Sequence, residues 1–154
     1  MAEPIHYLSQ EKYDALKQEL NQLKTEERKK VAESLEYAKS LGDLSENAEY
    51  HEARDKQADL EDRITELEET LKYSQIVTAH HSSLVEVGVT VTTKRSDGRE
   101  EKFSIVGAEE TDMLAGKISH ESPLGSALLG HKVGDTVSVI TPKGETKYKI
   151  VNIQ

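Results

Sequence analysis

The sequence contains no cysteine and no tryptophan, and it has only one phenylalanine. The lack of cysteine excludes disulfide bonds and thiolate metal sites. Hydrophobic residues make up 35% of the 154 positions and charged residues 32%. A chain of this length holds one or two small domains, and this composition suits an elongated molecule better than one large core.

Long apolar runs are also missing. No stretch approaches the roughly 20 residues that a membrane-spanning helix needs, and residues 1–6 lack the charged-then-apolar pattern of a secretory signal. We therefore expect a soluble, cytoplasmic protein without a membrane partner. The six histidines show no ligand spacing, so no zinc site is expected.

Basic residues are fewer than acidic ones, with 20 Lys and Arg against 29 Asp and Glu, and the net charge is −9. Residues 1–78 carry 11 basic and 19 acidic side chains, whereas residues 79–154 carry 9 and 10. Neutralisation of phosphates by Lys and Arg dominates the affinity for duplex DNA, so this chain is a poor DNA binder on its own. A partner with a basic face, or a metal ion, fits the charge better.

The first half of the sequence has the spacing of a long α-helix. Ser9 offers a cap oxygen at its start, Glu11 a favourable first-turn charge, and Gly42 a typical stop. Between them, apolar or small residues recur about every 3.7 positions, with Glu27 filling one gap. The members of this stripe are Leu16, Leu20, Leu23, Val31, Leu35 and Ala38.

A second stripe follows, and its steps alternate between three and four residues, as in a helix seam. Its members are Tyr50, Ala53, Gln57, Leu60, Ile64, Leu67 and Leu71. Neither helix can bury its stripe alone, and a short connection makes the two helices antiparallel neighbours. We predict an N-terminal coiled-coil hairpin over residues 1–78, with its tip at 41–47 and arms about 45 Å long.

From residue 79 onward the helical period gives way to β patterns, which predict two hairpins of strands. The expected strands are Val85–Thr92 with Glu101–Val106, and Thr136–Thr141 with Thr146–Ile153. Between the hairpins, Ser122 as a cap and Pro123 at the first helical position predict a short helix. The predicted fold class is α+β, with a small antiparallel sheet domain over residues 79–154.

Two acidic residues, Asp43 and Glu46, lie at the predicted bend of the hairpin. Their spacing fits a capping box, in which Asp43 would accept a hydrogen bond at the start of the second helix. On spacing alone this interpretation is favoured. The alternative is that the tip delivers both carboxylates into the cavity of a partner.

Two segments resemble the bacterial Gre transcript-cleavage factors. GDLSENAEYHEAR, at 42–54, resembles the tip motif of that family, and SPLGSALLG, at 122–130, followed by GDTV, at 134–137, resembles its C-terminal signature. The order and separation of the motifs also match, so the resemblance covers almost the whole chain. It reverses the preference for a mere capping box.

The resemblance implies a non-enzymatic accessory factor of RNA polymerase. In this family the hairpin enters the secondary channel of the polymerase, and an FKBP-like C-terminal domain docks at the channel rim. The factor stimulates the polymerase's own endonuclease, which removes the extruded 3′ end of the nascent RNA from backtracked, arrested complexes so that elongation resumes. Contact with DNA is expected only indirectly, through the elongation complex.

The resemblance also implies roles for single residues. Asp43 and Glu46 would be supplied to the polymerase active site, where they would hold a Mg²⁺ ion jointly with the polymerase. Mg²⁺ prefers oxygen ligands and often takes one or two protein carboxylates. No cofactor of the chain's own is expected.

Further tip residues are weaker candidates. Lys39 and Arg54 could steer the RNA phosphates, although a salt bridge or a solvated position explains them at least as well. Asn47 and Tyr50 could shape the tip or touch RNA, and the seam position of Tyr50 favours packing. Ser45 could be a simple helix cap.

In the second half, Ser122, Pro123 and Leu124 are candidates for a polymerase contact. The alternative is a helix start with core residues, and Pro123 is the best candidate of the three for a contact.

Three other functions remain open at this point. A relative of the same fold could occupy the channel as an inhibitor, but a plain Asp/Glu pair argues against this. A coiled-coil adaptor for protein interactions is a second alternative. A stand-alone nuclease fits least, because an exposed carboxylate pair lacks the pocket and the further ligands of metal catalysis.

Overall fold

The computed structural model describes residues 4–154, which form two compact units. One unit comprises residues 13–73, and the other combines residues 4–12 with 74–154. This division differs from the predicted boundary at residue 78. The reason is that strand β1 (His6–Leu8) pairs in parallel with strand β2 (Ser74–Ile76), so residues 4–12 group with residues 74–154. This second group is called the C-terminal unit.

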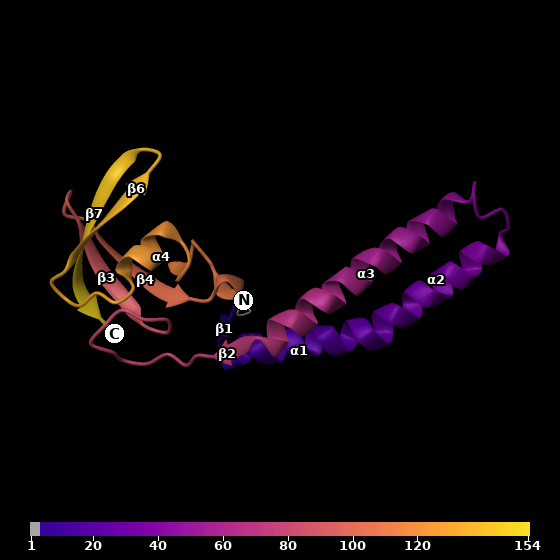
Figure 1. Ribbon diagram of the computed structural model, residues 1–154, viewed down its shortest axis with the longest axis horizontal. Coiled ribbons are helices and arrows are strands. Elements are labelled where there is room, and N and C mark those ends of the chain that lie inside the picture. Colours follow the sequence, from indigo (N-terminus) through magenta and orange to yellow (C-terminus); the bar gives the residue numbers. More distant parts are fainter. Residues whose placement is uncertain (1–3) are drawn as a thin grey trace. The chain divides into compact units, whose positions relative to one another are not determined.

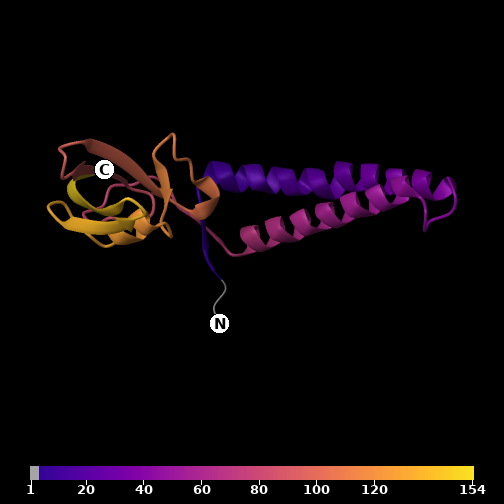
Figure 2. The ribbon, with the colours of Figure 1, turned by 90° about the horizontal axis from the view of Figure 1, so that it is seen from above.

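The first arm of the hairpin is a continuous helical stretch made of α1 (Gln10–Gln22), a π-helical segment (Leu23–Glu27) and α2 (Arg28–Ser40). Figures 1 and 2 show α1 and α2 following one another along this arm. The predicted start is confirmed, because Ser9 Oγ accepts a hydrogen bond from Lys12 N at 3.1 Å.

The π-helical segment is a departure from the regular helix that the stripe predicts. From Leu23 to Leu35 the stripe advances in four-residue steps through Glu27 and Val31. Each such step overshoots a turn of 3.6 residues by about 40°. A wider π turn takes up part of this drift and keeps the stripe facing its partner helix.

The second arm is α3 (Ala48–Lys72), which lies antiparallel to the first. Both predicted stripes are confirmed, since every member is buried or partly buried. The most enclosed positions are Leu16, Leu35, Ala38, Ala53, Ile64 and Leu67. The hairpin therefore has a core only one seam wide.

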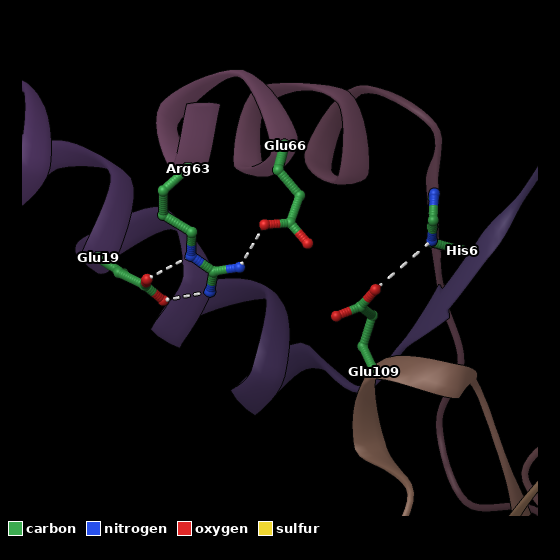
Figure 3. A network of polar contacts seen from close by, with 5 residues as sticks. All are labelled: His6, Glu19, Arg63, Glu66 and Glu109. Atoms are coloured by element: carbon green, nitrogen blue, oxygen red, sulfur yellow. Dashed lines mark hydrogen bonds and ion pairs between the residues drawn. The ribbon is translucent and has the colours of Figure 1, made fainter. Parts of the chain in front are cut away.

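Ion pairs flank this seam. Figure 3 shows Arg63 of α3 between Glu19 of α1 and Glu66, with N···O distances of 2.9 and 2.8 Å. Hydrogen bonds to these two carboxylates raise the pKa of the Arg63 guanidinium, so it remains charged. Arg28 bridges to Glu61 across the seam in the same way, at 2.8 Å.

The C-terminal unit contains a five-stranded sheet in the order β5-β4-β3-β7-β6. Its strands are β3 (Thr90–Arg95), β4 (Glu100–Val106), β5 (Lys117–Ser119), β6 (Thr136–Thr141) and β7 (Gly144–Ile153). All pairings are antiparallel except β4–β5. The predicted α+β class, the two hairpins and the short helix α4 (Pro123–Leu128) are confirmed.

One predicted strand is wrong in its first half. The segment from Val85 is irregular, and β3 begins only at Thr90. Gly88 has φ of +101°, and a Cβ there would lie 2.8 Å from Val77 Cγ1, so a turn with a close approach replaces the strand. Val85 and Val89 are nevertheless buried.

The core of this unit lies between one face of the sheet and α4. Its buried members are Val85, Val89, Val91, Ile105, Ile118, Leu128, Val137 and Ile150. On its N-terminal side, Glu110 from the 3-10 turn Ala108–Glu110 accepts hydrogen bonds from Ser9 N at 2.7 Å and Ser9 Oγ at 2.5 Å. His6 and Glu109 lie near one another as well, with 3.9 Å between Nδ1 and Oε1 (Figure 3).

Over residues 4–154, no helix has the length and apolar character needed to cross a membrane.

Candidate functional site

The loop 41–47 joins the end of α2 to the start of α3 at one end of the hairpin (Figure 1). Gly42 ends the first arm as predicted, with φ of +82° and its N–H bonded to Lys39 O at 3.1 Å. Asp43 follows with φ of +37°, a left-handed conformation that is uncommon outside glycine but tolerated by Asp. The chain therefore reverses direction over a few residues.

The cap of the second helix is Asn47, not Asp43. Asn47 Oδ1 accepts a hydrogen bond from Tyr50 N at 3.0 Å, and Asn47 has the extended backbone of a cap residue. The capping-box interpretation of Asp43 and Glu46 is therefore wrong. It failed because α3 begins at Ala48, four residues later than the box requires.

Asn47 also closes the loop through its other side-chain atom. Asn47 Nδ2 donates to Ala38 O at 2.6 Å and to Gly42 O at 3.1 Å. One side chain thus connects the last turn of α2 with the first turn of α3. Such a connection fixes the conformation of the residues between them.

Asp43 and Glu46 are both exposed. Ser45 Oγ donates to Asp43 Oδ1 at 3.1 Å, and Glu46 N donates to Asp43 O at 3.3 Å. Neither carboxylate forms an ion pair with any residue in the range 4–154. The loop presents two negative charges to the solvent without a basic partner.

Several residues support this loop in ways that the sequence did not reveal. His51 Nε2 lies 3.2 Å from Ser45 O, and the rings of Tyr50 and His51 meet edge to face with centroids 5.7 Å apart. Ser45 holds Asp43 instead of capping a helix. Leu44 is 45% exposed between the two acids. Only the position of these residues within the tip motif could have indicated them.

Lys39 and Arg54 lie on either side of the loop, in the last turn of α2 and near the start of α3. Both are exposed. The alternative that they form salt bridges is not observed within the described part of the chain. Tyr50 is half-buried, in agreement with the packing role expected from its seam position.

The donor chemistry of the loop fits a hard cation such as Mg²⁺. Carboxylate oxygens are the ligands that Mg²⁺ prefers, and it commonly takes only one or two from a protein. Among residues 4–154 no group of three or more His, Cys, Asp or Glu side chains could hold a metal ion. Asp43 and Glu46 by themselves are thus a pair of carboxylates and not such a group.

The second candidate segment divides into structural and exposed residues. Ser122 caps α4, since its Oγ accepts from Gly125 N at 3.1 Å and donates to Ser119 O at 2.7 Å. Leu124 packs against the core. Pro123 is exposed at the start of α4 and is free to contact a partner.

Comparison with known families gives two matches that together span most of the chain. Residues 6–76 match the family model "Transcription elongation factor, N-terminal", and residues 80–154 match "Transcription elongation factor, GreA/GreB, C-term".

Individual relatives agree with these matches. The transcription elongation factor GreA of Bacillus cytotoxicus is 43% identical over 99% of this chain and 98% of its own length. GreA of Listeria monocytogenes is 48% identical over 90% of this chain and 88% of its own. A crystal structure of GreA factor homolog 1 (Gfh1) of Thermus thermophilus covers 98% of this chain and 99% of that chain, with 28% identity and a TM-score of 0.45. The chain therefore belongs to the GreA/GreB family of transcription elongation factors.

Proposed function

We propose that this elongation factor binds RNA polymerase, inserts its hairpin into the secondary channel, and stimulates cleavage of the 3′ end of nascent RNA in backtracked complexes. The chain is an accessory factor in this proposal, and the polymerase performs the cleavage. The factor would act in the cytoplasm, on the elongation complex, and would touch DNA only through it.

One observation carries the proposal. The loop 41–47 exposes Asp43 and Glu46, and neither of them caps a helix or has a basic partner within residues 4–154. Two like charges close together in a short loop repel each other, and neither forms an ion pair that would stabilise the hairpin. Both carboxylates are available to bind a cation that a partner holds.

The side chains of the tip divide the work. Asn47 fixes the loop to both helices, and Ser45 holds the carboxylate of Asp43. The loop would therefore enter the active site with less conformational freedom to lose than a flexible one. A Mg²⁺ ion, when bound jointly with the polymerase, would supply the activation of water and the stabilisation of the leaving oxygen. Lys39 and Arg54 are positioned to attract RNA phosphates, since both are exposed and unpaired within the described range.

In the C-terminal unit, Pro123 is the proposed polymerase contact. Ser122 and Leu124 hold the segment that presents it, through the cap of α4 and through the core.

The two alternatives have less support. An inhibitor of the same fold would have to present its acids unproductively, and the curated relatives carry the name of an elongation factor. A role as a coiled-coil adaptor does not explain why the loop exposes two acidic residues.

The test is a transcript-cleavage assay on halted elongation complexes with the double variant Asp43→Asn and Glu46→Gln. We expect stimulated cleavage to fall by about 100-fold, because the ligands that orient the ion are lost. Affinity for the polymerase should remain.

The matched control is Glu33→Gln with Asp55→Asn, which removes the same charge from exposed positions along the two arms. This control should cleave like the unmodified factor. Full activity of the tip variant would refute the assignment, and an equal loss in both variants would reduce it to a general effect of charge.

A further inference from the structure

One face of the five-stranded sheet takes no part in the core and is basic. Side chains alternate between the two faces along a strand, and directly paired residues share a face. Lys94 of β3 pairs with Lys149 of β7 and with Glu100 of β4. Lys102 and Lys147 lie two residues from these partners, on the same face.

These four residues, Lys94, Lys102, Lys147 and Lys149, are called the lysine face. All four are exposed. Their strands are neighbours in the order β4-β3-β7, and neighbouring strands are about 4.8 Å apart. The positive charges therefore lie within a small area.

The lysine face contrasts with the three paired lysines of the hairpin. On the hairpin, Lys24, Lys30 and Lys56 each form an ion pair with a glutamate. No member of the lysine face forms one among residues 4–154, although Glu100 and Glu145 share the face.

The direct pairing of Lys94 with Lys149 is a second unusual feature of the lysine face. Like charges opposite each other destabilise a sheet, and a chain with 29 acidic residues has ample means to avoid the arrangement. The Lys94–Lys149 pair itself does not stabilise the sheet, which is consistent with a role in binding a partner.

We propose that the lysine face docks onto an acidic protein surface of RNA polymerase. The inference rests on the proposed function, which makes the polymerase the partner. It adds a second contact to the one expected at Pro123, on a different part of the C-terminal unit.

A nucleic acid fits this face less well. Single strands bind to proteins by stacking on aromatic rings, and the paired positions put Phe103 and Tyr148 on the core side of the sheet. Arg95 and Arg99, which would bind phosphate best, are engaged with Asp97. A second copy of the chain fits less well too, because two molecules of net charge −9 repel each other.

The experiment measures the affinity of the factor for core RNA polymerase free of DNA and RNA, over a series of salt concentrations. The variant is Lys94→Gln with Lys149→Gln. The dissociation constant should rise about three- to tenfold at low salt and depend less on salt, since exposed charge contacts are weak and screened. Cleavage at saturating factor should be unchanged, and Tm should stay the same or rise because the repulsion is relieved.

The matched control is Lys132→Gln with Lys143→Gln. It removes the same charge from exposed turns of the same unit, outside the lysine face. The control should bind like the unmodified factor. The variant Lys94→Arg with Lys149→Arg should do the same, because it keeps the charge.

Three results would overturn the inference. The first is an unchanged dissociation constant and salt dependence, or an equal loss in the control. The second is a loss of binding to a single-stranded RNA probe with no change toward the polymerase, which would assign the face to nucleic acid. The third is a dimer in sedimentation that the variant dissociates. If the unmodified factor failed to bind polymerase at all, the proposed function would fall together with this inference.

Discussion

The hairpin and the C-terminal unit use the same limited set of residues in opposite ways. The hairpin buries one narrow seam and pairs its basic side chains with glutamates along both sides, as Arg63 and Arg28 do. The C-terminal unit encloses a core in which Leu128, Ile105 and Ile150 are fully buried, and its lysines form no ion pair with any residue from 4 to 154. In each region we assign function to one group of unpaired charges, the acids at the tip and the lysines on the sheet.

The largest difference between the regions should appear in stability. Leu128→Ala removes a fully buried side chain from a core closed on several sides, whereas Leu67→Ala removes one from a seam between two helices. We expect a loss of about 3–5 kcal/mol in the free energy of unfolding for the first and about 2–3 kcal/mol for the second, because a seam relaxes into a cavity more easily. Denaturant unfolding followed by circular dichroism measures both.

Leu114→Ala is the control, since this side chain is fully exposed and its loss should change stability by less than about 0.5 kcal/mol. A seam variant that costs more than the core variant would contradict the contrast between the two regions.

A smaller effect on stability is expected at the tip, where the side chain of Asn47 links the ends of α2 and α3. Asn47→Asp keeps the oxygen that caps α3 but replaces the donor to Ala38 O and Gly42 O with a second oxygen. We expect a loss of about 1–2 kcal/mol and a several-fold loss of stimulated cleavage, with polymerase affinity retained. Thermal unfolding and the cleavage assay measure the two effects.

Asn21→Asp makes the same chemical change at an exposed position of α1 and should leave both properties unaltered. If Asn47→Asp cleaved normally, the loop would not need the fixed conformation that we assign to it.

The smallest effect concerns pH and lies in the C-terminal unit. The carbonyl of Thr78, 2.9 Å from His80 Nδ1, and then the carboxylate of Glu86, 2.6 Å from Nε2, raise the pKa of His80. A raised pKa means that folding favours the protonated form. The resulting stabilisation is present below the ordinary pKa of about 6.5 and is lost as the pH rises through the folded-state pKa.

His80→Gln should therefore lower Tm slightly at about pH 5.5 and not at about pH 8.5. His81→Gln, an exposed neighbour, serves as the reference. A difference that grew with pH would have the wrong sign for this explanation.

The elements of the fold were largely predictable from periodicity. The two stripes, the stop at Gly42, the cap at Ser122 and the strand hairpins follow from local spacing and turn chemistry, and the structure confirms them. The sequence also indicated an acidic bend at Asp43 and Glu46, whose exposure agrees with the proposed role.

Predictions that depended on where an element begins were less successful. Asp43 and Asn47 both fit a helix cap by residue type, and only the position of the first helical turn decided between them. The start of β3 depended on how closely Val77 approaches Gly88, which is a contact between segments that the pattern of valines does not encode.

Local chemistry alone thus determined which segments are helical, which are extended and where the acidic bend lies, because these properties depend on neighbours within a few positions. The tertiary structure decided what required distant residues to meet. It paired β1 with β2 and aligned Lys94 with Lys149, because strand pairing joins segments far apart in the chain. It also gave Asn47 its bonds to Ala38 and Gly42, because a side chain can close a loop only after both helices are in place.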